Sequence, residues 1–308
     1  MREIILGSGG VVGNELAKVL AHSKNEVRLV SRNPRPVVGK EELFKADLTN
    51  REETIDAVTG ADIVYLTVGL LYDTKVWKTQ WPLVMQNVIE ACNTHGAKLI
   101  FLDNVYAYGK VDGWMKEETP YNPCSKKGEV RAKVAAVLET AMRSGEVNTL
   151  IARSADFYGR GAEKTFAKPM IFDKYKAGKS AAWLLDKHQP HSMTYTKDIA
   201  KALAFLAHDD HAYGQVWHLP TDKAAPTGED FMNAVAKSYG VEPKQSVLSS
   251  WMLNVAGLFD PLVRETKEMA YQFDAPYLFD SSKFEKRYFQ ATPYDAAIEE
   301  TVALGSTE

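Results

Sequence analysis

Four glycines lie within seven residues near the N-terminus, in the segment Gly7-Ser8-Gly9-Gly10-Val11-Val12-Gly13. The run Glu3–Leu6 before this segment predicts a strand, and the apolar spacing from Leu16 to Leu20 after it predicts a helix. A tight turn between strand and helix needs glycine for its backbone angles, and the first helical turn offers amide donors and the positive end of a dipole. Because a pyrophosphate approaches such a backbone closely only where no Cβ intervenes, the segment predicts a dinucleotide-binding loop. An ordinary glycine-rich turn is the alternative.

The end of the next predicted strand, Glu26–Val30, bears on which nicotinamide dinucleotide would bind. An acidic side chain at that place holds the ribose hydroxyls of NAD, whereas arginine suits the 2′-phosphate of NADP. Here Ser31 and Arg32 follow the strand and no carboxylate does, so we expect NADP in preference to NAD, which stays possible. Arg35 is a substitute candidate, and a solvated surface arginine is the alternative interpretation.

Two further strand ends are predicted to contact the adenosine part of the cofactor. Asp47 and Leu48 follow the predicted strand Leu43–Ala46. Thr67, Val68 and Gly69 stand at the end of the predicted strand Asp62–Thr67, where ligands bind in parallel sheets. Asp47 could equally cap the helix that follows it.

The composition argues against several classes of function. The chain has 308 residues, 45% of them apolar, and a formal net charge of −3, so we expect a globular protein with a small-molecule substrate and no nucleic-acid partner. It holds no long uncharged apolar window and runs directly into the first strand, from which we expect no membrane association and a cytoplasmic location. Cys92 and Cys124 lack metal or redox spacing, and His188 with His191 lacks a third ligand, so no metal is expected.

Short β-branched runs alternate with helical periods along most of the chain, which is typical of a parallel sheet flanked by helices. Strands are expected over Glu3–Leu6, Glu26–Val30, Leu43–Ala46, Asp62–Thr67, Lys98–Leu102, Thr149–Arg153 and Gln215–Leu219. Helices are expected over Gly13–Ala21, Arg51–Val58, Trp81–Thr94, Lys127–Arg143 and Lys197–Ala207. The predicted fold class is therefore α/β, a doubly wound parallel sheet with a smaller C-terminal lobe.

The domain division follows from where this alternation stops. Residues 1–160, rejoined by 195–222, are predicted to form the dinucleotide-binding domain, and residues 161–194 with 223–308 a substrate-binding lobe. Aromatic side chains of the C-terminal part are expected to pack that lobe, and some to line a substrate pocket, namely Trp251, Phe259, Tyr271, Phe273 and Tyr277.

Further segments, together with the glycine segment, resemble the extended short-chain dehydrogenase/reductases, the NAD-dependent epimerase/dehydratase family. They are Val105–Gly109, Glu118–Pro120 with Pro123, Arg153–Gly159, His191–Ala200 and Gly214–Trp217, and they occur in the family's order. The resemblance implies a Rossmann-type domain, a substrate lobe and cofactor contacts from Ser154, Ala155 and Phe157. It also implies a homodimer formed through helices 81–94 and 127–143.

In this family a Ser/Thr–Tyr–Lys set moves a proton while hydride moves to or from the nicotinamide, and the chain departs from that set. Asn104 stands at the serine or threonine position, Lys127 at the tyrosine position and Arg131 at the lysine position. Lys127 and Arg131 lie one helical turn apart at the edge of the apolar stripe, so both could face the crevice of the sheet.

We therefore expect Lys127, or a tyrosine such as Tyr106, Tyr108 or Tyr158, to deliver the proton. Asn104 would hold the substrate oxygen, and Arg131 would orient phosphate or ribose hydroxyls. The alternatives are that the two cations are solvated helix charges and that the tyrosines pack the core or its rim. The expected function is an NAD(P)-dependent oxidoreductase or epimerase for a small carbonyl, hydroxyl or sugar-like substrate, and the alternative is an NADP-binding regulator or sensor without turnover.

Overall fold

The computed structural model describes residues 1–305, which form two compact units. Unit 1 comprises Met1–Ala107, Lys126–Arg153 and Ile199–Trp217. Unit 2 comprises Tyr108–Ser125, Ser154–Asp198 and His218–Glu308, of which the last three residues lie outside the described part of the chain. The segment Tyr108–Ser125 groups with unit 2, whereas the sequence assigned it to the first domain. The assignment of cofactor and substrate binding to separate domains stays a prediction.

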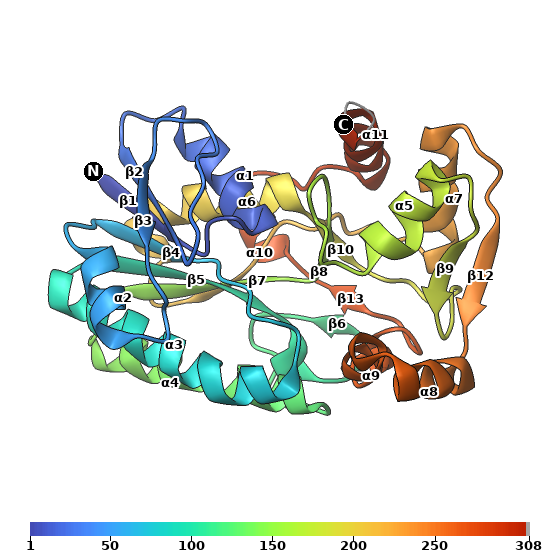
Figure 1. The fold of residues 1–308 in the computed structure, drawn as a ribbon, viewed down its shortest axis with the longest axis horizontal. Coiled ribbons are helices and arrows are strands. Elements are labelled where there is room, and N and C mark those ends of the chain that lie inside the picture. Colours follow the sequence, from blue (N-terminus) through green and yellow to red (C-terminus); the bar gives the residue numbers. More distant parts are fainter. Residues whose placement is uncertain (306–308) are drawn as a thin grey trace. The chain divides into compact units, whose positions relative to one another are not determined.

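The centre of unit 1 is a seven-stranded sheet in the order β11-β7-β5-β4-β1-β2-β3 (Figure 1). Its strands are β1 (Arg2–Leu6), β2 (Glu26–Ser31), β3 (Glu42–Lys45), β4 (Ile63–Leu66), β5 (Lys98–Asn104), β7 (Thr149–Ser154) and β11 (Val216–His218). The chain leaves β1 toward β2 and β3 and then crosses back to β4, which pairs in parallel with the other edge of β1. The Rossmann-type α/β fold predicted from the sequence is confirmed, and the order of strands reverses between β1 and β4.

Helices cover both faces of this sheet, with α1 and α6 on one face and α2, α3 and α4 on the other (Figure 1). Their bounds are α1 (Val11–Leu20), α2 (Arg51–Val58), α3 (Thr74–His95), α4 (Lys126–Ser144) and α6 (Thr196–Ala207). The predicted start of the third helix at Trp81 is wrong, because Asp73 caps α3 by accepting hydrogen bonds from the amides of Lys75 and Val76. Burial of Trp77 and Trp81 holds the added turns despite the proline at position 82.

Unit 2 is built from short elements. Its helices are α5 (Asp173–Lys176), α7 (Gly228–Tyr239), α8 (Ser250–Phe259), α9 (Pro261–Lys267), α10 (Ser282–Glu285) and α11 (Tyr294–Gly305). Its strands form three parallel pairs: β6 (Trp114–Met115) with β13 (Leu278–Phe279), β8 (Asp156–Tyr158) with β10 (Met193–Tyr195), and β9 (Ala181–Leu184) with β12 (Gln245–Leu248). Strands of two to four residues are too short to show a hydrophobic period, so the sequence did not predict these pairs.

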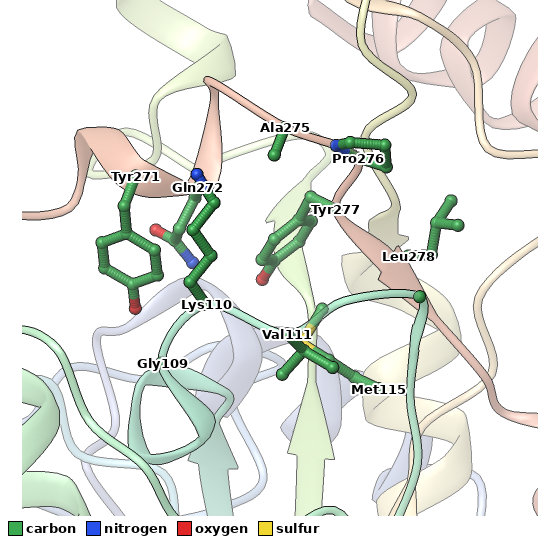
Figure 2. A pocket seen from close by; sticks show the side chains of 11 residues that line it. Gly109, Lys110, Val111, Met115, Tyr271, Gln272, Ala275, Pro276, Tyr277 and Leu278 are labelled. Carbon is green, nitrogen blue, oxygen red and sulfur yellow. The ribbon is translucent and has the colours of Figure 1, made fainter.

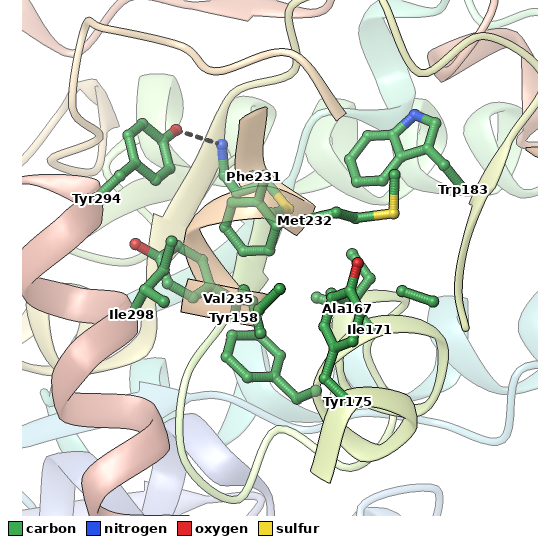
Figure 3. Packing of buried hydrophobic residues seen from close by; sticks show 14 of the residues in the cluster. Tyr158, Ala167, Ile171, Tyr175, Trp183, Phe231, Met232, Val235, Tyr294 and Ile298 are labelled. Carbon is green, nitrogen blue, oxygen red and sulfur yellow. Dashed lines mark hydrogen bonds between the residues drawn. The ribbon is translucent and has the colours of Figure 1, made fainter. Parts of the chain in front are cut away.

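An aromatic cluster forms the core of unit 2 (Figure 3). The ring of Tyr158 stacks on those of Phe172 and Tyr294 and meets the ring of Phe231 edge-on at 5.3 Å between centroids. The Tyr294 hydroxyl accepts a hydrogen bond from the amide of Met193 at 2.7 Å, so the cluster also pins β10. Stacked and edge-on rings of this kind add to the free energy of burial.

The predicted packing of the C-terminal aromatics holds only in part. Phe273 and Tyr277 are buried, as expected. For Trp251 and Phe259 the prediction is wrong, since these side chains are 68% and 83% exposed. They lie on α8, a helix that buries only Leu253 and Gly257.

Three global features bear on the functional classes. Cys92 is buried and Cys124 is exposed, and neither is in a disulfide. Within residues 1–305, no cluster of three or more histidine, cysteine, aspartate or glutamate side chains has the arrangement of a metal site. No helix in the same range has both the length and the apolar character needed to cross a membrane.

Candidate active site

The glycine segment connects β1 directly to α1, and its first glycine is fixed by close backbone packing. The amides of Gly7 and Ser8 both donate to the carbonyl of Val30, at 3.0 and 3.1 Å. Gly7 has a φ of +110°, and a Cβ on it would stand 2.5 Å from the backbone of Val68. The turn therefore lies against the end of β4, and no residue but glycine fits there.

The far end of the segment is equally tight, while its middle is open. A Cβ on Gly13 would lie 2.9 Å from the carbonyl oxygen of Gly7, so this glycine lets α1 pack closely on the turn. Gly9 has a φ of +91° and no atom within 4 Å of its Cβ position. Its amide donates to Asn14 Oδ1 at 3.0 Å, which holds the open middle of the loop in place.

The donors around this loop fit a diphosphate. Gly10 stands at the N-cap of α1 and supplies no side-chain cap, so the amides of the first turn have no side-chain partner there. The Ser8 hydroxyl is buried, and no hydrogen-bond partner for it exists within the described residues. Helix N-termini attract anions, and phosphate oxygens would supply the acceptor that a buried hydroxyl requires.

The residues predicted to contact the adenosine lie at the ends of β2, β3 and β4. Asp47 accepts hydrogen bonds from the amide and hydroxyl of Thr49, and these bonds, with the charge of Arg32 nearby, hold the pKa of Asp47 below its ordinary value. The alternative that Asp47 caps α2 is wrong, since Asn50 does so by accepting from the amides of Glu52 and Glu53.

The other adenosine candidates differ in exposure. Arg32 is exposed and Ser31 is half-buried, so a guanidinium reaches solvent at this edge. Leu48 is buried, and its carbonyl accepts from Asn87 Nδ2 at 2.9 Å, which ties the end of β3 to α3. Thr67 and Val68 are half-buried beside the glycine loop, and Gly69 is exposed. Their cofactor contacts remain predictions.

Lys127, on the first turn of α4, is fully buried. Its ammonium nitrogen lies 3.1 Å from Thr74 Oγ1 and 4.5 Å above the centre of the Tyr72 ring. The alternative of a solvated helix charge is therefore wrong for Lys127. A buried lysine held by a hydroxyl and a ring face has a defined position, which a proton donor requires.

Arg131 is also buried, and a carboxylate that the sequence did not single out explains why. Asp103, at the end of β5, accepts from Arg131 Nε at 2.8 Å and from Arg153 Nε at 3.0 Å. The Arg131 guanidinium also lies over the ring of Trp81 at 4.3 Å. The alternative of a solvated helix charge is therefore wrong for Arg131 too, because Asp103 binds its guanidinium. The predicted contact of Arg131 with phosphate or ribose hydroxyls remains a prediction.

The charge state of Asp103 follows from the balance at this buried cluster. Burial alone raises the pKa of its carboxyl, but the charges and hydrogen bonds of Arg131 and Arg153 outweigh burial, and the net pKa lies below the ordinary value. The carboxylate therefore stays ionised and joins α4 to β5 and β7. The sequence held only two signals for this cluster. Asp103 stands near the end of one apolar strand, and Arg153 stands at the end of another.

Asn104 and Tyr106 lie just after Asp103. The Asn104 side-chain carbonyl accepts from the amide of Tyr106 at 3.0 Å, which fixes the carboxamide and directs its NH2 group elsewhere. Tyr106 is half-buried, and its ring stacks on that of Trp77 at 6.2 Å. Asn104 is the last residue of β5, two residues beyond the predicted strand end at Leu102, and strand ends are the usual position of ligand-binding residues in such sheets.

The other tyrosine candidates, Tyr108 and Tyr158, are buried in unit 2. The Tyr108 hydroxyl lies 2.8 Å from His218 Nε2, and His218 Nδ1 lies 2.9 Å from the carbonyl of Asp280. Since that carbonyl only accepts, Nδ1 carries the proton and Tyr108 donates to Nε2. Burial raises the pKa of Tyr158 well above its ordinary value. Both environments match the alternative that these tyrosines pack the core.

Ser154, Ala155 and Phe157, which the resemblance assigned to the cofactor, group with unit 2. Ser154 and Ala155 are buried, and Phe157 is half-buried. The Ser154 hydroxyl has no hydrogen-bond partner among residues 1–305. Their contacts with a cofactor stay a prediction.

Unit 2 also contains a shallow pocket between the loop that follows Tyr108 and the segment before β13 (Figure 2). Figure 2 shows the side chains of Tyr271, Gln272 and Tyr277 extending toward the loop of residues 109–111. Lys110 and Asp274 form an ion pair at 2.7 Å beside it. Tyr271 and Tyr277 thus line a pocket, while the use of a pocket by the substrate stays a prediction.

Comparison with known proteins bears on the family of this chain. The model of the NAD dependent epimerase/dehydratase family matches residues 4–219. The chain belongs to this family. Members of the family are enzymes, and the match spans the glycine loop, Lys127 and the Asp103 cluster. A search of curated proteins finds no match.

Solved structures with the same fold cover the whole length of the chain. The UDP-glucose 4-epimerase of Thermus thermophilus, in complex with NAD, is 18% identical with a TM-score of 0.81, over 98% of each chain. The UDP-glucuronic acid 4-epimerase of Bacillus cereus, in complex with NAD, is 16% identical with a TM-score of 0.80, over 100% of this chain and 99% of the other. The dTDP-glucose 4,6-dehydratase of Bacillus anthracis, also with NAD, is 12% identical with a TM-score of 0.81, over 100% and 97%.

The Asp103 cluster yields a test of the site's framework. Replacing Asp103 by Asn leaves two buried guanidinium groups without their carboxylate, which we expect to lower the free energy of unfolding by about 3–5 kcal/mol. The pKa of Asp103 is lower in the folded state than in the unfolded state. Its contribution to the free energy of unfolding is therefore fully present above about pH 4 and is lost as the pH falls through the lowered folded-state pKa. Urea unfolding of both proteins between neutral and acid pH measures the difference, which shrinks with falling pH.

The matched control is Asp210→Asn, which removes an exposed carboxylate paired with Lys98 in the same unit. That variant should unfold almost like the wild type, because exposed ion pairs contribute little. Equal urea midpoints for Asp103→Asn and Asp210→Asn would contradict the proposed role of Asp103.

Proposed function

We propose that this protein is an NADP-dependent oxidoreductase or epimerase that acts on a carbonyl or hydroxyl group of a small, sugar-like molecule. The observation that carries the proposal is the glycine loop, whose open face at Gly9, uncapped helix amides and buried Ser8 hydroxyl fit a diphosphate. Family membership and the sugar-nucleotide substrates in the names of the similar structures support the substrate class.

The preference for NADP rests on Arg32. Its guanidinium is exposed beside Asp47, at the strand end where the adenosine ribose of a bound dinucleotide lies in such folds. A 2′-phosphate would gain a charge-assisted hydrogen bond from this arginine. NAD remains the competing cofactor, because the similar structures carry NAD and the carboxylate of Asp47 could serve ribose hydroxyls.

The nicotinamide supplies hydride transfer when bound, and the chain must then move a proton. Lys127 is our candidate donor, because Thr74 and the Tyr72 ring hold its ammonium group at the start of α4. Asn104 would hold the reacting oxygen through its NH2 group, which the contact with Tyr106 leaves available. Lys127 and Asn104 thus replace the tyrosine and the serine or threonine of the family's set, and Arg131 supports them through Asp103.

The cofactor preference is tested by titration of the purified protein with NADP and NAD. Replacing Arg32 by Ala should weaken NADP binding about 10- to 100-fold, the size of one charge-assisted contact, while NAD binding changes little. Isothermal titration calorimetry measures both dissociation constants. Arg143→Ala, which removes an exposed arginine near the end of α4 in the same unit, is the control and should leave both constants unchanged. Tighter binding of NAD than of NADP, unaltered in Arg32→Ala, would refute the NADP assignment.

The proton-transfer role is tested by Lys127→Met, which keeps most of the side-chain volume and removes the ammonium group. Turnover against a panel of ketones, aldehydes and nucleotide sugars should fall at least ~100-fold, the usual contribution of a general acid, with cofactor affinity largely retained. Tyr108→Phe is the control, since its buried hydroxyl bonds to His218, and it should keep its activity.

Two results would count against this role. Full activity in Lys127→Met would remove Lys127 from the chemistry. A wild-type protein that binds cofactor but turns over nothing in the panel would favour the competing function, a dinucleotide-binding regulator or sensor. That function is motivated by Lys127 and Arg131, which stand at the start of α4 where the family has Tyr-x-x-x-Lys. A cytoplasmic location is part of the proposal and is testable by cell fractionation.

A further inference from the structure

One wall of the pocket in unit 2 holds an amide group that the fold leaves without a hydrogen bond. Gln272 ends a short helical turn (Ala270–Gln272), and only 4% of it is exposed. Its Nε2 atom is buried, and no hydrogen-bond partner for this atom exists within residues 1–305. A buried donor without an acceptor lowers the stability of a fold, so such a group calls for an acceptor from another source.

Gln272 lines the pocket together with two tyrosines. Figure 2 shows the side chains of Tyr271, Gln272 and Tyr277 extending toward the loop of residues 109–111, which lines the pocket from the other side. All of the lining residues belong to unit 2. A hydroxyl or carbonyl oxygen of a molecule bound in this pocket would supply the acceptor that the Gln272 amide lacks.

The wall beside this amide is aromatic and held in place by stacking. The ring of Tyr277 stacks on the ring of His191 at 4.4 Å between centroids, and His191 also stacks on Phe273 at 4.7 Å. Met115 and Leu278 add apolar surface to the lining. Ring faces and apolar side chains around a single polar group are the usual lining of a small-molecule site, and they suit the flat face of a ring-shaped molecule.

The charges at this pocket do not suit a phosphate. Lys110 is the only charged side chain among the lining residues, and it forms an ion pair with Asp274 at 2.7 Å. Asp112 is exposed on the same loop as Lys110, so the two lining segments, 109–115 and 271–278, carry one positive and two negative charges. The negative charges of a diphosphate would therefore face an excess of carboxylates here.

The histidine behind the aromatic wall does not change this balance. His191 is 2% exposed, and its Nε2 atom lies 3.1 Å from Asp156 Oδ2. Any positive charge on His191 is thus matched by a carboxylate and covered by rings. The pocket differs in this respect from the glycine loop of unit 1, whose helix amides fit a diphosphate.

We infer that this pocket binds an uncharged, sugar-like ring and that Gln272 determines this specificity by donating a hydrogen bond to an oxygen atom of the ring. A ring that carries a nucleoside diphosphate is disfavoured by the carboxylates around the pocket. The inference deepens the proposed function and rests on it, because it takes the bound ring to be the substrate.

The test compares uncharged and charged probes by isothermal titration calorimetry of the full-length protein. The uncharged probes are 4-nitrophenyl β-D-glucopyranoside and 4-nitrophenyl β-D-galactopyranoside, and the charged probe is UDP-glucose. At saturating NADP, which occupies the glycine loop, at least one uncharged probe should bind, and UDP-glucose should bind at least ~10-fold more weakly than that probe.

The role of Gln272 is tested by Gln272→Met, which removes the amide and keeps most of the side-chain volume. Affinity for the uncharged probe should fall about 3- to 10-fold, the size of one neutral hydrogen bond. The midpoint of thermal unfolding without probe should rise, because an apolar side chain replaces a buried donor that lacks an acceptor. Gln290→Met, which changes an exposed glutamine of the same unit, is the control and should alter neither quantity.

Three results would overturn the inference. They are tighter binding of UDP-glucose than of both uncharged probes at saturating NADP, no binding of either uncharged probe, and equal affinity of the wild type and Gln272→Met for the uncharged probe. A lower unfolding midpoint in Gln272→Met with unchanged probe affinity would assign Gln272 a purely structural role. A protein that binds the uncharged probe but neither NADP nor NAD would refute the proposed function and still confirm the ligand class of the pocket.

Discussion

The close approach of two backbones, at Gly7 and Val68, is the constraint on which the site of this protein depends. It requires the absence of a side chain at residue 7, and it presses the turn after β1 against the end of β4. After this turn the chain enters α1, and no side chain caps the first amides of the helix. The turn lies where the order of strands in the sheet reverses, between β1 and β4. We therefore expect this surface to favour an anion, since main-chain donors lie there with the positive end of a helix dipole.

The second constraint is the buried charge cluster at the end of β5. One carboxylate, Asp103, holds arginines from α4 and β7, and the ring of Trp81 covers one of them. Because α4 is fastened to the sheet one turn beyond Lys127, the position of that lysine is set by the same cluster. Lys127 and Arg131 are therefore integrated into the fold, and the guanidinium of Arg131 is held by Asp103.

Much of unit 1 could be predicted from the sequence, because its strands and helices are long enough to show their periods and the glycine segment has a strict backbone requirement. The start of α3 was missed since Pro82 resembles a helix beginning, while the true cap is Asp73. Asp103 was missed because its importance arises from two arginines distant in sequence. In unit 2, strands of two to four residues carry no period, and the exposure of Trp251 and Phe259 contradicts the general tendency of aromatics to be buried.

The most direct test of the account is a crystal structure of the protein grown with NADP. The account predicts that the diphosphate lies over the first turn of α1, with phosphate oxygens within hydrogen-bond distance of the Val11 and Val12 amides and of the Ser8 hydroxyl. A loop left empty at saturating cofactor, or a diphosphate bound elsewhere on the molecule, would contradict it.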